Sequence, residues 1–201
     1  INPGLRYTKV DVSQNGGLGT VTQKNVMLDP MQINDGIIAV KHGNGRDWWL
    51  IYKHGFPQND SMCRVLVSPN GVSLQPVQQI GTFMESSAYR MSINPAGDLI
   101  AGVTVRGVIE LFDFDRCTGL LSNHRYLKNN LGTNDEKERF WSVEFSSSSR
   151  YLYVATADWT SYLYQFDYSD GAFLSTSTAN AVAKKNSNAL LVGNVVVKLP
   201  S

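Results

Sequence analysis

Hydrophobic and polar residues alternate through the stretch Phe140–Gly171, which predicts three strands joined by two turns. In the runs Arg150–Ala155 and Tyr162–Asp167, aromatic side chains stand at alternate positions, and Ser, Asp and Gly bound the runs. A period of two with such boundaries is typical of strands. Because both faces of each run are largely apolar, we expect these strands to be covered on both sides.

The same pattern occurs earlier in the chain at a constant offset. Leu163–Asp167 lies 52 positions after the similar string Leu111–Asp115, and the turns before and after these strings keep that offset. Asp47–Leu50 belongs to a third copy, and Tyr7–Gly16 to a partial fourth. Repeats of roughly 40–50 residues with four short strands each are typical of β-propeller blades. A β-sandwich with coincidental similarity is the alternative.

The repeat defines the expected domain organisation. We predict an all-β fold, a β-propeller of four-stranded antiparallel blades, with about 3.5–4 blades forming a partial ring. The expected parts are the outer strands of a partial blade (1–36), three blades (37–81, 88–128 and 139–183) and the start of a further blade (184–201). The chain begins with Ile1 rather than Met. We therefore expect the remaining blades of the same polypeptide, or a second chain, to close the ring.

Composition excludes some classes of partner. Only 17% of the residues are charged, and the formal net charge is +1. This balance favours neither nucleic acid nor an acidic membrane surface as a partner. No apolar run approaches the roughly 18 residues that a membrane-spanning helix needs. We therefore expect no nucleic-acid binding and no membrane insertion.

The two cysteines are predicted to be free thiols. Cys63 falls on a central strand of one blade, and Cys117 falls in a turn of the next. A disulfide needs Cα atoms within about 7 Å of each other, which different heights in neighbouring blades disfavour. Cysteine usage therefore does not indicate a cellular compartment.

No pattern of catalytic or metal-binding residues is evident. The histidines, His42, His54 and His124, are scattered without ligand spacing. Asp113 and Asp115 come closest to a calcium loop, but they alternate within a strand, and the repeat copy loses one carboxylate. The sequence has no Gly-x-Ser-x-Gly elbow. We therefore predict no catalytic residues, no metal site and no cofactor.

The string from His42 to Trp49 (HGNGRDWW) admits two interpretations. The structural one is a turn at Asn44-Gly45, held by an Asx-type bond from Asp47, with Trp48 and Trp49 on opposite faces of a strand. The functional one is a pocket with polar groups and an aromatic wall. We favour the structural interpretation.

Four connections are expected to share one face of the propeller. These are the loops 54–60, 104–107 and 157–161 and the link 129–139. Binding residues usually lie on loops held by a rigid scaffold. The candidate binding residues on this face are His54, Asp60, Arg106, Trp159, Asp135, Glu136, Lys137 and Glu138. The alternative is an ordinary solvated loop.

Several strings together resemble one known group of propellers. They are NGGLGTVTQKNVML, HGNGRDWWLI, INPAGDLIA, ELFDFDRCTGLLS, VEFSSSSRYLYVAT and YLYQFD. They are similar to the propeller region of large secreted proteins of Bacteroidota that carry a type IX secretion sorting domain. They are more distantly similar to YVTN-type and lactonase-like seven-bladed propellers, which are also related in form to WD40 repeats. The resemblance implies export, so we expect an extracellular or outer cell surface location.

The resulting expectation is a non-enzymatic binding or scaffold module of a secreted or cell-surface bacterial protein. Its partner would be a protein or a glycan bound on the loop face. One alternative is a lactonase-like or other hydrolase with a site at the ring centre, although no lactonase residue can be placed on a position of this sequence. Another is a structural subunit of a surface assembly or filament. Fold alone does not decide among them.

Overall fold

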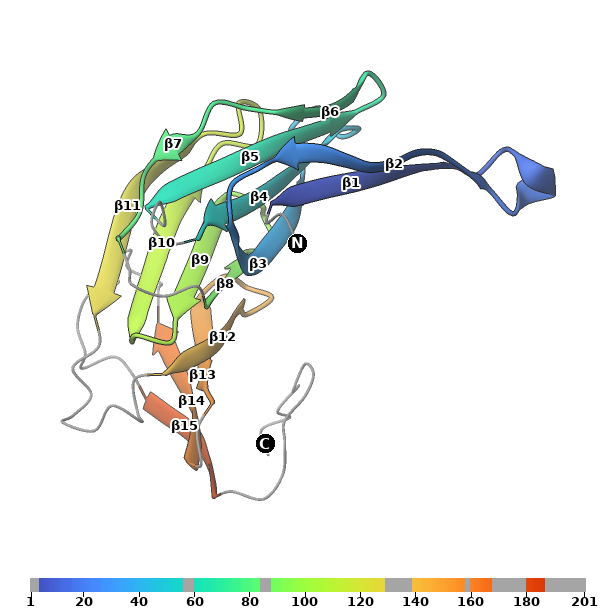
Figure 1. The fold of residues 1–201 in the computed structure, drawn as a ribbon. Coiled ribbons are helices and arrows are strands. Elements are labelled where there is room, and N and C mark those ends of the chain that lie inside the picture. The colour runs from blue at the N-terminus through green and yellow to red at the C-terminus, as the bar shows by residue number, and fades with distance from the viewer. Residues whose placement is uncertain are drawn as a thin grey trace.

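The chain forms antiparallel sheets in a computed structural model (Figure 1). The structure describes residues 4–55, 60–83, 88–128, 139–157, 160–167 and 180–186. Within these ranges, strands alternate with short turns, and a single 3-10 turn at Asn15–Gly17 is the helical element. No helix among the described residues has the length and apolar character needed to cross a bilayer. The all-β prediction is therefore confirmed.

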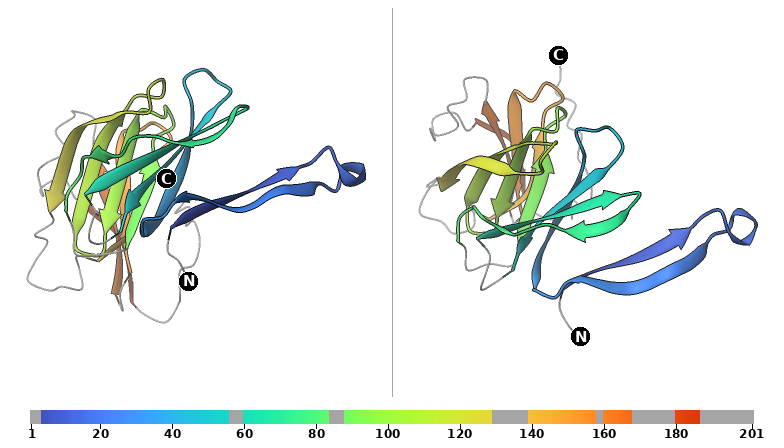
Figure 2. Two further views of the ribbon diagram at one scale, coloured as in Figure 1. Left: turned by 45° about the horizontal axis from the view of Figure 1, so that its top comes forward. Right: turned by 90° about the horizontal axis from the view of Figure 1, so that it is seen from above.

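The first sheet is a long hairpin that projects from the body of the molecule (Figures 1 and 2). It pairs β1 (Leu5–Asp11) with β2 (Thr20–Asp29). In the turn between them, Asn15, Gly16 and Gly17 all have positive φ. Glycine adopts such φ values without the steric cost that other residues incur.

The second sheet has the order β3-β4-β5-β6, with β7 also paired to β5. Its strands are β3 (Ile33–Lys41), β4 (Trp48–His54), β5 (Ser61–Ser68), β6 (Gly71–Leu74) and β7 (Gln78–Gln79). The four-stranded blade predicted by the repeat is altered here, because its outer strand is interrupted before Pro76 and β7 follows as a separate strand. Proline has no N–H for the ladder, and the Pro76 carbonyl instead accepts a hydrogen bond from Arg64 Nη2 at 2.7 Å.

The third and fourth sheets repeat this four-stranded pattern without interruption. The third contains β8 (Tyr89–Ile93), β9 (Leu99–Thr104), β10 (Val108–Phe114) and β11 (Leu121–Lys128). The fourth contains β12 (Phe140–Phe145), β13 (Tyr151–Thr156), β14 (Thr160–Asp167) and β15 (Asn180–Asn186). In both sheets, each strand pairs with its neighbours in chain order.

The sheets are arranged like propeller blades. The first strand of the third sheet, β8, contacts both β3 and β12, the first strands of the sheets on either side. The later strands of each sheet lie progressively farther from these three (Figure 2). The first strands of successive sheets therefore face a common axis, as the inner strands of a propeller do.

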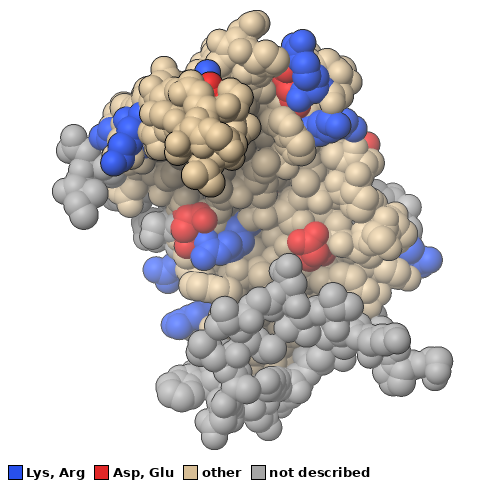
Figure 3. Space-filling model, turned by 90° about the vertical axis from the view of Figure 1, so that its right-hand side faces the viewer, with Lys and Arg blue, Asp and Glu red and all other residues tan. Residues whose placement is uncertain are grey.

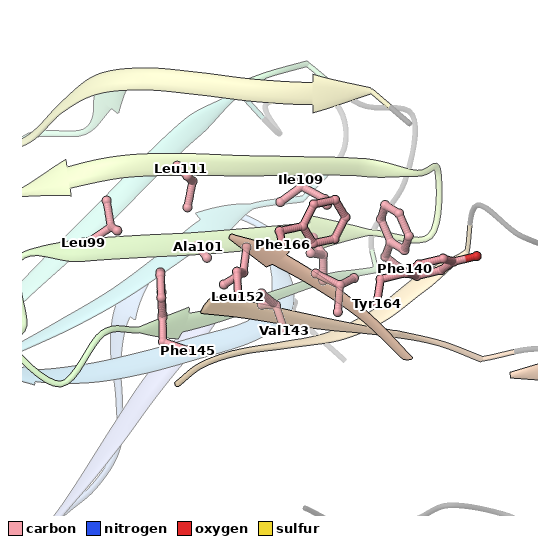
Figure 4. Packing of buried hydrophobic residues seen from close by; sticks show 12 residues of the cluster. Leu99, Ala101, Ile109, Leu111, Phe140, Val143, Phe145, Leu152, Tyr164 and Phe166 are labelled. Atoms are coloured by element: carbon pink, nitrogen blue, oxygen red, sulfur yellow. The ribbon is translucent and has the colours of Figure 1, made fainter. Parts of the chain in front are cut away.

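Apolar side chains between neighbouring sheets form the core. One cluster lies between the third and fourth sheets and includes Leu111, Phe140, Leu152 and Phe166 (Figure 4). Another lies between the second and third sheets and includes residues such as Phe112. Leu111 and Phe112 point to opposite sides of β10, so one strand contributes to both clusters. β10 is therefore covered on both faces, and burial of each such side chain contributes about 1.5–3 kcal/mol. In β13, for which the sequence predicts the same, only alternate residues are buried and those between them are partly exposed.

The repeat extends to the hydrogen bonds of the turns. In the third sheet, Leu99 N donates to Asn94 Oδ1 at 3.0 Å. In the fourth, at the matching positions, Tyr151 N donates to Ser146 Oγ at 3.0 Å. In the second sheet, Asn44 Oδ1 accepts hydrogen bonds from two backbone N–H groups of its turn. Short polar side chains thus hold the same type of turn in each copy.

The string from His42 to Trp49 is a structural turn, with one correction. Asn44, not Asp47, supplies the Asx-type bonds to the backbone, while the Asp47 carboxylate pairs with the neighbouring Arg46 at 2.8 Å. Trp49 is buried and its Nε1 donates to the Arg116 carbonyl at 2.9 Å, whereas Trp48 is exposed. The two tryptophans face opposite ways, as predicted.

Candidate functional site

A buried polar network joins the second and third sheets. Lys53 Nζ on β4 lies 2.9 Å from Glu110 Oε2 on β10 and donates to the Thr82 carbonyl at 3.0 Å. The Tyr89 hydroxyl donates to the same Glu110 oxygen at 2.9 Å, and His124 Nε2 lies 3.0 Å from the other. Thr82 N also donates to Glu110 Oε1. Every oxygen of this buried carboxylate therefore has partners.

The environment of Glu110 keeps it ionised. Burial opposes ionisation, but the hydrogen bond to His124 and the charge of Lys53 outweigh it and lower the pKa of Glu110 to about 2. Burial lowers the pKa of Lys53 and raises that of Tyr89. Lys53 and Glu110 side chains are both fully buried. Because the Lys53 and Glu110 charges are paired and buried, and His124 is partly exposed at the edge of the network, we interpret it as structural.

A second buried cluster lies where the hairpin meets the second sheet. Asp29, the last residue of β2, accepts a hydrogen bond from the Tyr52 hydroxyl at 2.6 Å through Oδ2. His54 Nε2 lies 2.8 Å from the same oxygen, and Met31 N donates to Oδ1 at 2.9 Å. Cys63 on β5 stands opposite Tyr52 in the strand pairing. The cluster therefore draws side chains from three strands.

The cluster contains the kinds of atoms that bind metals. Asp29, His54 and Cys63 each offer one ligand atom, and these atoms all lie within 4.8 Å of one another. All three residues are buried. Burial raises the pKa of the Cys63 thiol to about 12. Burial opposes ionisation of Asp29, but hydrogen bonds from Tyr52 and His54 outweigh it and lower the pKa of Asp29.

An exposed group of side chains lies on the inner strands. Arg90 on β8 forms an ion pair with Asp35 on β3, with 2.6 Å between Nη1 and Oδ1. Its guanidinium also lies over the Trp141 ring on β12, 5.4 Å from the ring centroid. Trp141 is 47% exposed, which is unusual for so large an apolar side chain. Arg90 thus links three sheets where they face the common axis.

Trp141 also lines a hollow between the third and fourth sheets. The hollow has a volume of about 390 Å³, and its lining consists of Ala88, Val105, Arg106, Arg139, Trp141 and Ala157. The strand-connecting segments near 106, 139 and 157 therefore converge on one face, as the sequence predicted. Two arginines and a tryptophan form the recognisable chemistry of this hollow.

A second hollow, of about 480 Å³, lies at the opposite ends of the strands. It is lined by carboxylates, including Asp98, Asp113 and Asp115. Asp113 pairs with Arg125 at 2.6 Å, and Asp98 accepts from Asn94 at 2.8 Å. Asp115 caps its turn by accepting from Cys117 N at 2.8 Å. These carboxylates hold turns and strands, so this hollow is a weaker candidate.

On the face toward which the hairpin points, charged side chains form a few separate groups on a largely uncharged surface (Figure 3). An acidic and a basic group adjoin there. A broad field of one sign is not seen on this face. Local groups of side chains, rather than overall charge, would therefore determine recognition.

The structure separates the predicted binding residues. Arg106 lines the hollow beside Trp141. His54 is buried in the Asp29 cluster, and Asp60 is partly buried beside Ser61. The other candidates lie outside the described residues. They are Trp159 and four residues of the 129–139 link, Asp135, Glu136, Lys137 and Glu138. Arg106 is therefore the described candidate that lines the hollow, and its role in binding stays a prediction.

Trp141 and Arg90 were not recognised from the sequence. Simple alternation would put Trp141 on one face of β12 and both Phe140 and Ser142 on the other. The pairing of β12 with β13, however, shifts register between Phe140 and Ser142. This irregularity leaves two consecutive side chains, Trp141 and Ser142, exposed. The signal available in the sequence was a tryptophan next to the polar end of the 129–139 link.

Similar folds are found among solved structures. No family model matches the sequence, and no curated protein matches it. A Bacteroides uniformis protein provisionally assigned as a 6-phosphogluconolactonase aligns with TM-score 0.57 and 14% identity, over 92% of this chain and 55% of its own. A protein with the same provisional assignment, from Bacteroides fragilis, aligns with TM-score 0.55 and 12% identity, over 87% of this chain and 48% of its own. The β-propeller domain of Cps50 (Swd1) from Myceliophteria thermophila aligns with TM-score 0.51 and 11% identity, over 92% of this chain and 54% of its own.

These similarities establish the fold. This chain spans about half the length of the solved structures that it matches. Together with its four-stranded antiparallel sheets, they show that the chain forms part of a β-propeller. Such propellers include both lactonase-like proteins and WD40-type scaffolds, and identities this low carry no information on activity.

Proposed function

We propose that this chain is part of a non-enzymatic β-propeller binding module, whose partner occupies the hollow beside Trp141. One observation carries this proposal: a half-exposed tryptophan lines the hollow together with two arginines, on the loop face. By contrast, the clusters around Glu110 and Asp29 are buried. The accessible chemistry of the described residues is therefore that of recognition.

The side chains indicate what kind of partner fits. Arginine presents a planar fork of donors that matches a carboxylate in two hydrogen bonds. Tryptophan offers a large apolar face with a polar N–H at its edge, a combination favoured at binding surfaces. The partner would therefore carry carboxylate groups next to an apolar face. Acidic glycans and acidic protein segments both provide this combination.

Binding to two anionic polymers tests the proposal. The full polypeptide would be titrated with polygalacturonate and with poly-glutamate, and neutral dextran would serve as the uncharged control. We expect Arg106→Glu to weaken binding at least about tenfold, as a loss of about 1.4 kcal/mol implies. Lys24→Glu makes the same charge change on the exposed hairpin and should have little effect. Equal losses for both variants, or no binding at all, would refute the proposal.

An aromatic variant tests the same site without changing charge. Trp141→Ala removes the exposed ring and should weaken binding of whichever polymer is recognised. Trp48→Ala removes a ring of similar exposure on β4 and serves as its matched control. If only the two charge variants change binding, the interaction is unspecific electrostatic attraction and does not use this hollow.

A lactonase-like hydrolase is the second candidate function. It is favoured by the provisional assignment of two similar structures as 6-phosphogluconolactonases, and arginines such as those of the hollow can also bind a phosphate group. Hydrolysis of 6-phosphogluconolactone by the full polypeptide, above the rate in buffer, would favour it. If Arg106→Glu lowered that rate, the hollow would be the substrate site.

The cellular location is also a proposal. The resemblance of the sequence strings to secreted Bacteroidota propellers with type IX sorting domains favours an extracellular or outer cell surface location. Fractionation of the source cells, with detection of the native polypeptide by antibody, tests it. Protease digestion of intact cells should remove the surface-exposed protein. Recovery solely from the cytoplasm would contradict this location.

A further inference from the structure

The cluster of Asp29, His54 and Cys63 contains one oxygen, one nitrogen and one sulfur ligand. Their ligand atoms lie within 4.8 Å of one another, and the residues are at most 5% exposed. Buried titratable groups of this kind are rare unless they are paired or bind a metal. Sequence spacing does not reveal the cluster, because its members come from three different strands.

We propose that Asp29, His54 and Cys63 bind one zinc ion, which fastens the hairpin to the second sheet. Zinc prefers tetrahedral coordination by cysteine, histidine and carboxylate side chains. A mixed set of one thiolate, one imidazole and one carboxylate also fits its intermediate softness better than that of calcium or magnesium. The Tyr52 hydroxyl, which already contacts Asp29 at 2.6 Å, or a water molecule would complete the site.

The strands hold the ligands close to the required geometry. Asp29 ends β2, His54 ends β4, and Cys63 lies within β5. Metal–ligand distances of 2.0–2.3 Å place tetrahedral ligand atoms about 3.3–3.7 Å apart. The 2.8 Å contact between His54 Nε2 and Asp29 Oδ2 would open by less than about 1 Å, and the sulfur would move inward. Rotations of side chains suffice for these changes.

Zinc binding changes the protonation of the cluster in a defined way. The Cys63 thiol loses its proton to solvent and binds as the thiolate. His54 binds through Nε2, so the single proton of the neutral imidazole moves to Nδ1. Asp29 binds as the carboxylate that it already is. Starting from neutral imidazole, one proton is therefore released for each zinc ion bound, and affinity rises with pH.

A bound zinc ion would link the hairpin to the second sheet. Asp29 belongs to the β1–β2 hairpin, whereas His54 and Cys63 belong to the second sheet. Apolar contacts also join the two, since Leu5 and Leu28 of the hairpin pack in the cluster that contains Tyr52, and β2 touches the short strand β6. A metal bound only by the folded state raises stability by mass action. Zinc would thus stabilise the hairpin in its observed position.

Titration with cobalt(II) tests the proposal directly. The full polypeptide, freed of metal by a chelator, should bind one cobalt ion and develop a thiolate-to-cobalt absorption band in the near ultraviolet. Intense visible bands should accompany it, as tetrahedral coordination requires. One equivalent of zinc should then abolish these bands, and zinc should raise the midpoint temperature of unfolding.

Two cysteine variants identify the ligand. Cys63→Ser should lose the near-ultraviolet band and weaken zinc binding by more than about 100-fold, because even outer partners of a metal site contribute 10–100-fold. Cys117→Ser removes the exposed thiol and should leave the band and the affinity unchanged. Loss of the band in Cys117→Ser instead, or no band in the unmodified protein, would overturn the proposal. Circular dichroism of each variant shows whether it remains folded.

Discussion

Lys53 and Glu110 form a fully buried ion pair that joins the second and third sheets, with 2.9 Å between Nζ and Oε2. The two residues lie far apart in sequence, on β4 and β10. Tyr89 contacts both: its hydroxyl donates to Glu110, and its ring lies under the Lys53 ammonium, 4.6 Å from the centroid. The pair therefore fixes how one blade sits against the next.

Removal of one member should destabilise the protein strongly. Lys53→Met leaves the Glu110 carboxylate buried without its countercharge, and we expect a loss of about 3–5 kcal/mol in the free energy of unfolding. Urea denaturation measures this loss. Arg150→Met breaks the exposed pair with Asp167 and should cost much less. A Lys53→Met effect as small as that of Arg150→Met would contradict the assignment.

The free energy of unfolding should depend on pH through the Glu110 carboxyl group. Its pKa is lowered from 4.5 to about 2 in the folded protein. As pH falls from about 4.5 to about 2, the unfolded chain gains a proton that the folded protein does not, so stability falls, by up to about 3 kcal/mol. Unfolding free energies measured across this range should show a shallower decline for Glu110→Gln. An unchanged decline would place the acid sensitivity elsewhere.

Gly102 provides the space that Tyr89 occupies. A Cβ atom at Gly102 would overlap the Tyr89 hydroxyl and ring, although the backbone at Gly102 is compatible with alanine. We expect Gly102→Ala to destabilise the protein by about 1–3 kcal/mol, as overpacking does. In a double-mutant cycle, Tyr89→Leu should remove most of this additional cost. Full additivity of the two changes would show that the residues do not interact.

The two thiols should differ in reactivity. Both cysteines are free, as predicted; Cys63 is buried and Cys117 is exposed. Burial also raises the pKa of Cys63 to about 12, so it is a thiol at neutral pH. A disulfide reagent should modify one thiol rapidly in the native protein and the second only after unfolding. In Cys117→Ser, rapid reaction of the native protein would contradict this difference.

The sequence predicted the elements with a clear period of two. The strands at 151–156 and 160–167 were expected almost as they occur, because their alternation is regular. The repeat offset also predicted four strands in each sheet. By contrast, β3 starts earlier than the expected residue 37, since an irregular pairing between Ile33 and Ile37 hides its alternation.

The candidate site was much less predictable. Arg106 was identified because turns between strands converge on one face, which follows from topology. Trp141 was missed because the register shift in β12 disrupts the period, and the Asp29 cluster because its residues meet only when sheets pack. His54 shows the limit most clearly: a loop position in the sequence becomes a buried hydrogen-bonding residue in the fold.

The β1–β2 hairpin has a practical consequence for handling the protein. Within the described chain it forms a two-stranded sheet of its own, so its outer strand edges have no neighbouring strand. It also exposes Val10, Val12 and Leu18. Unpaired edges with apolar side chains are templates for strand addition by other molecules. We therefore expect a preparation limited to these residues to tend to self-associate through the hairpin, to an extent that grows with protein concentration.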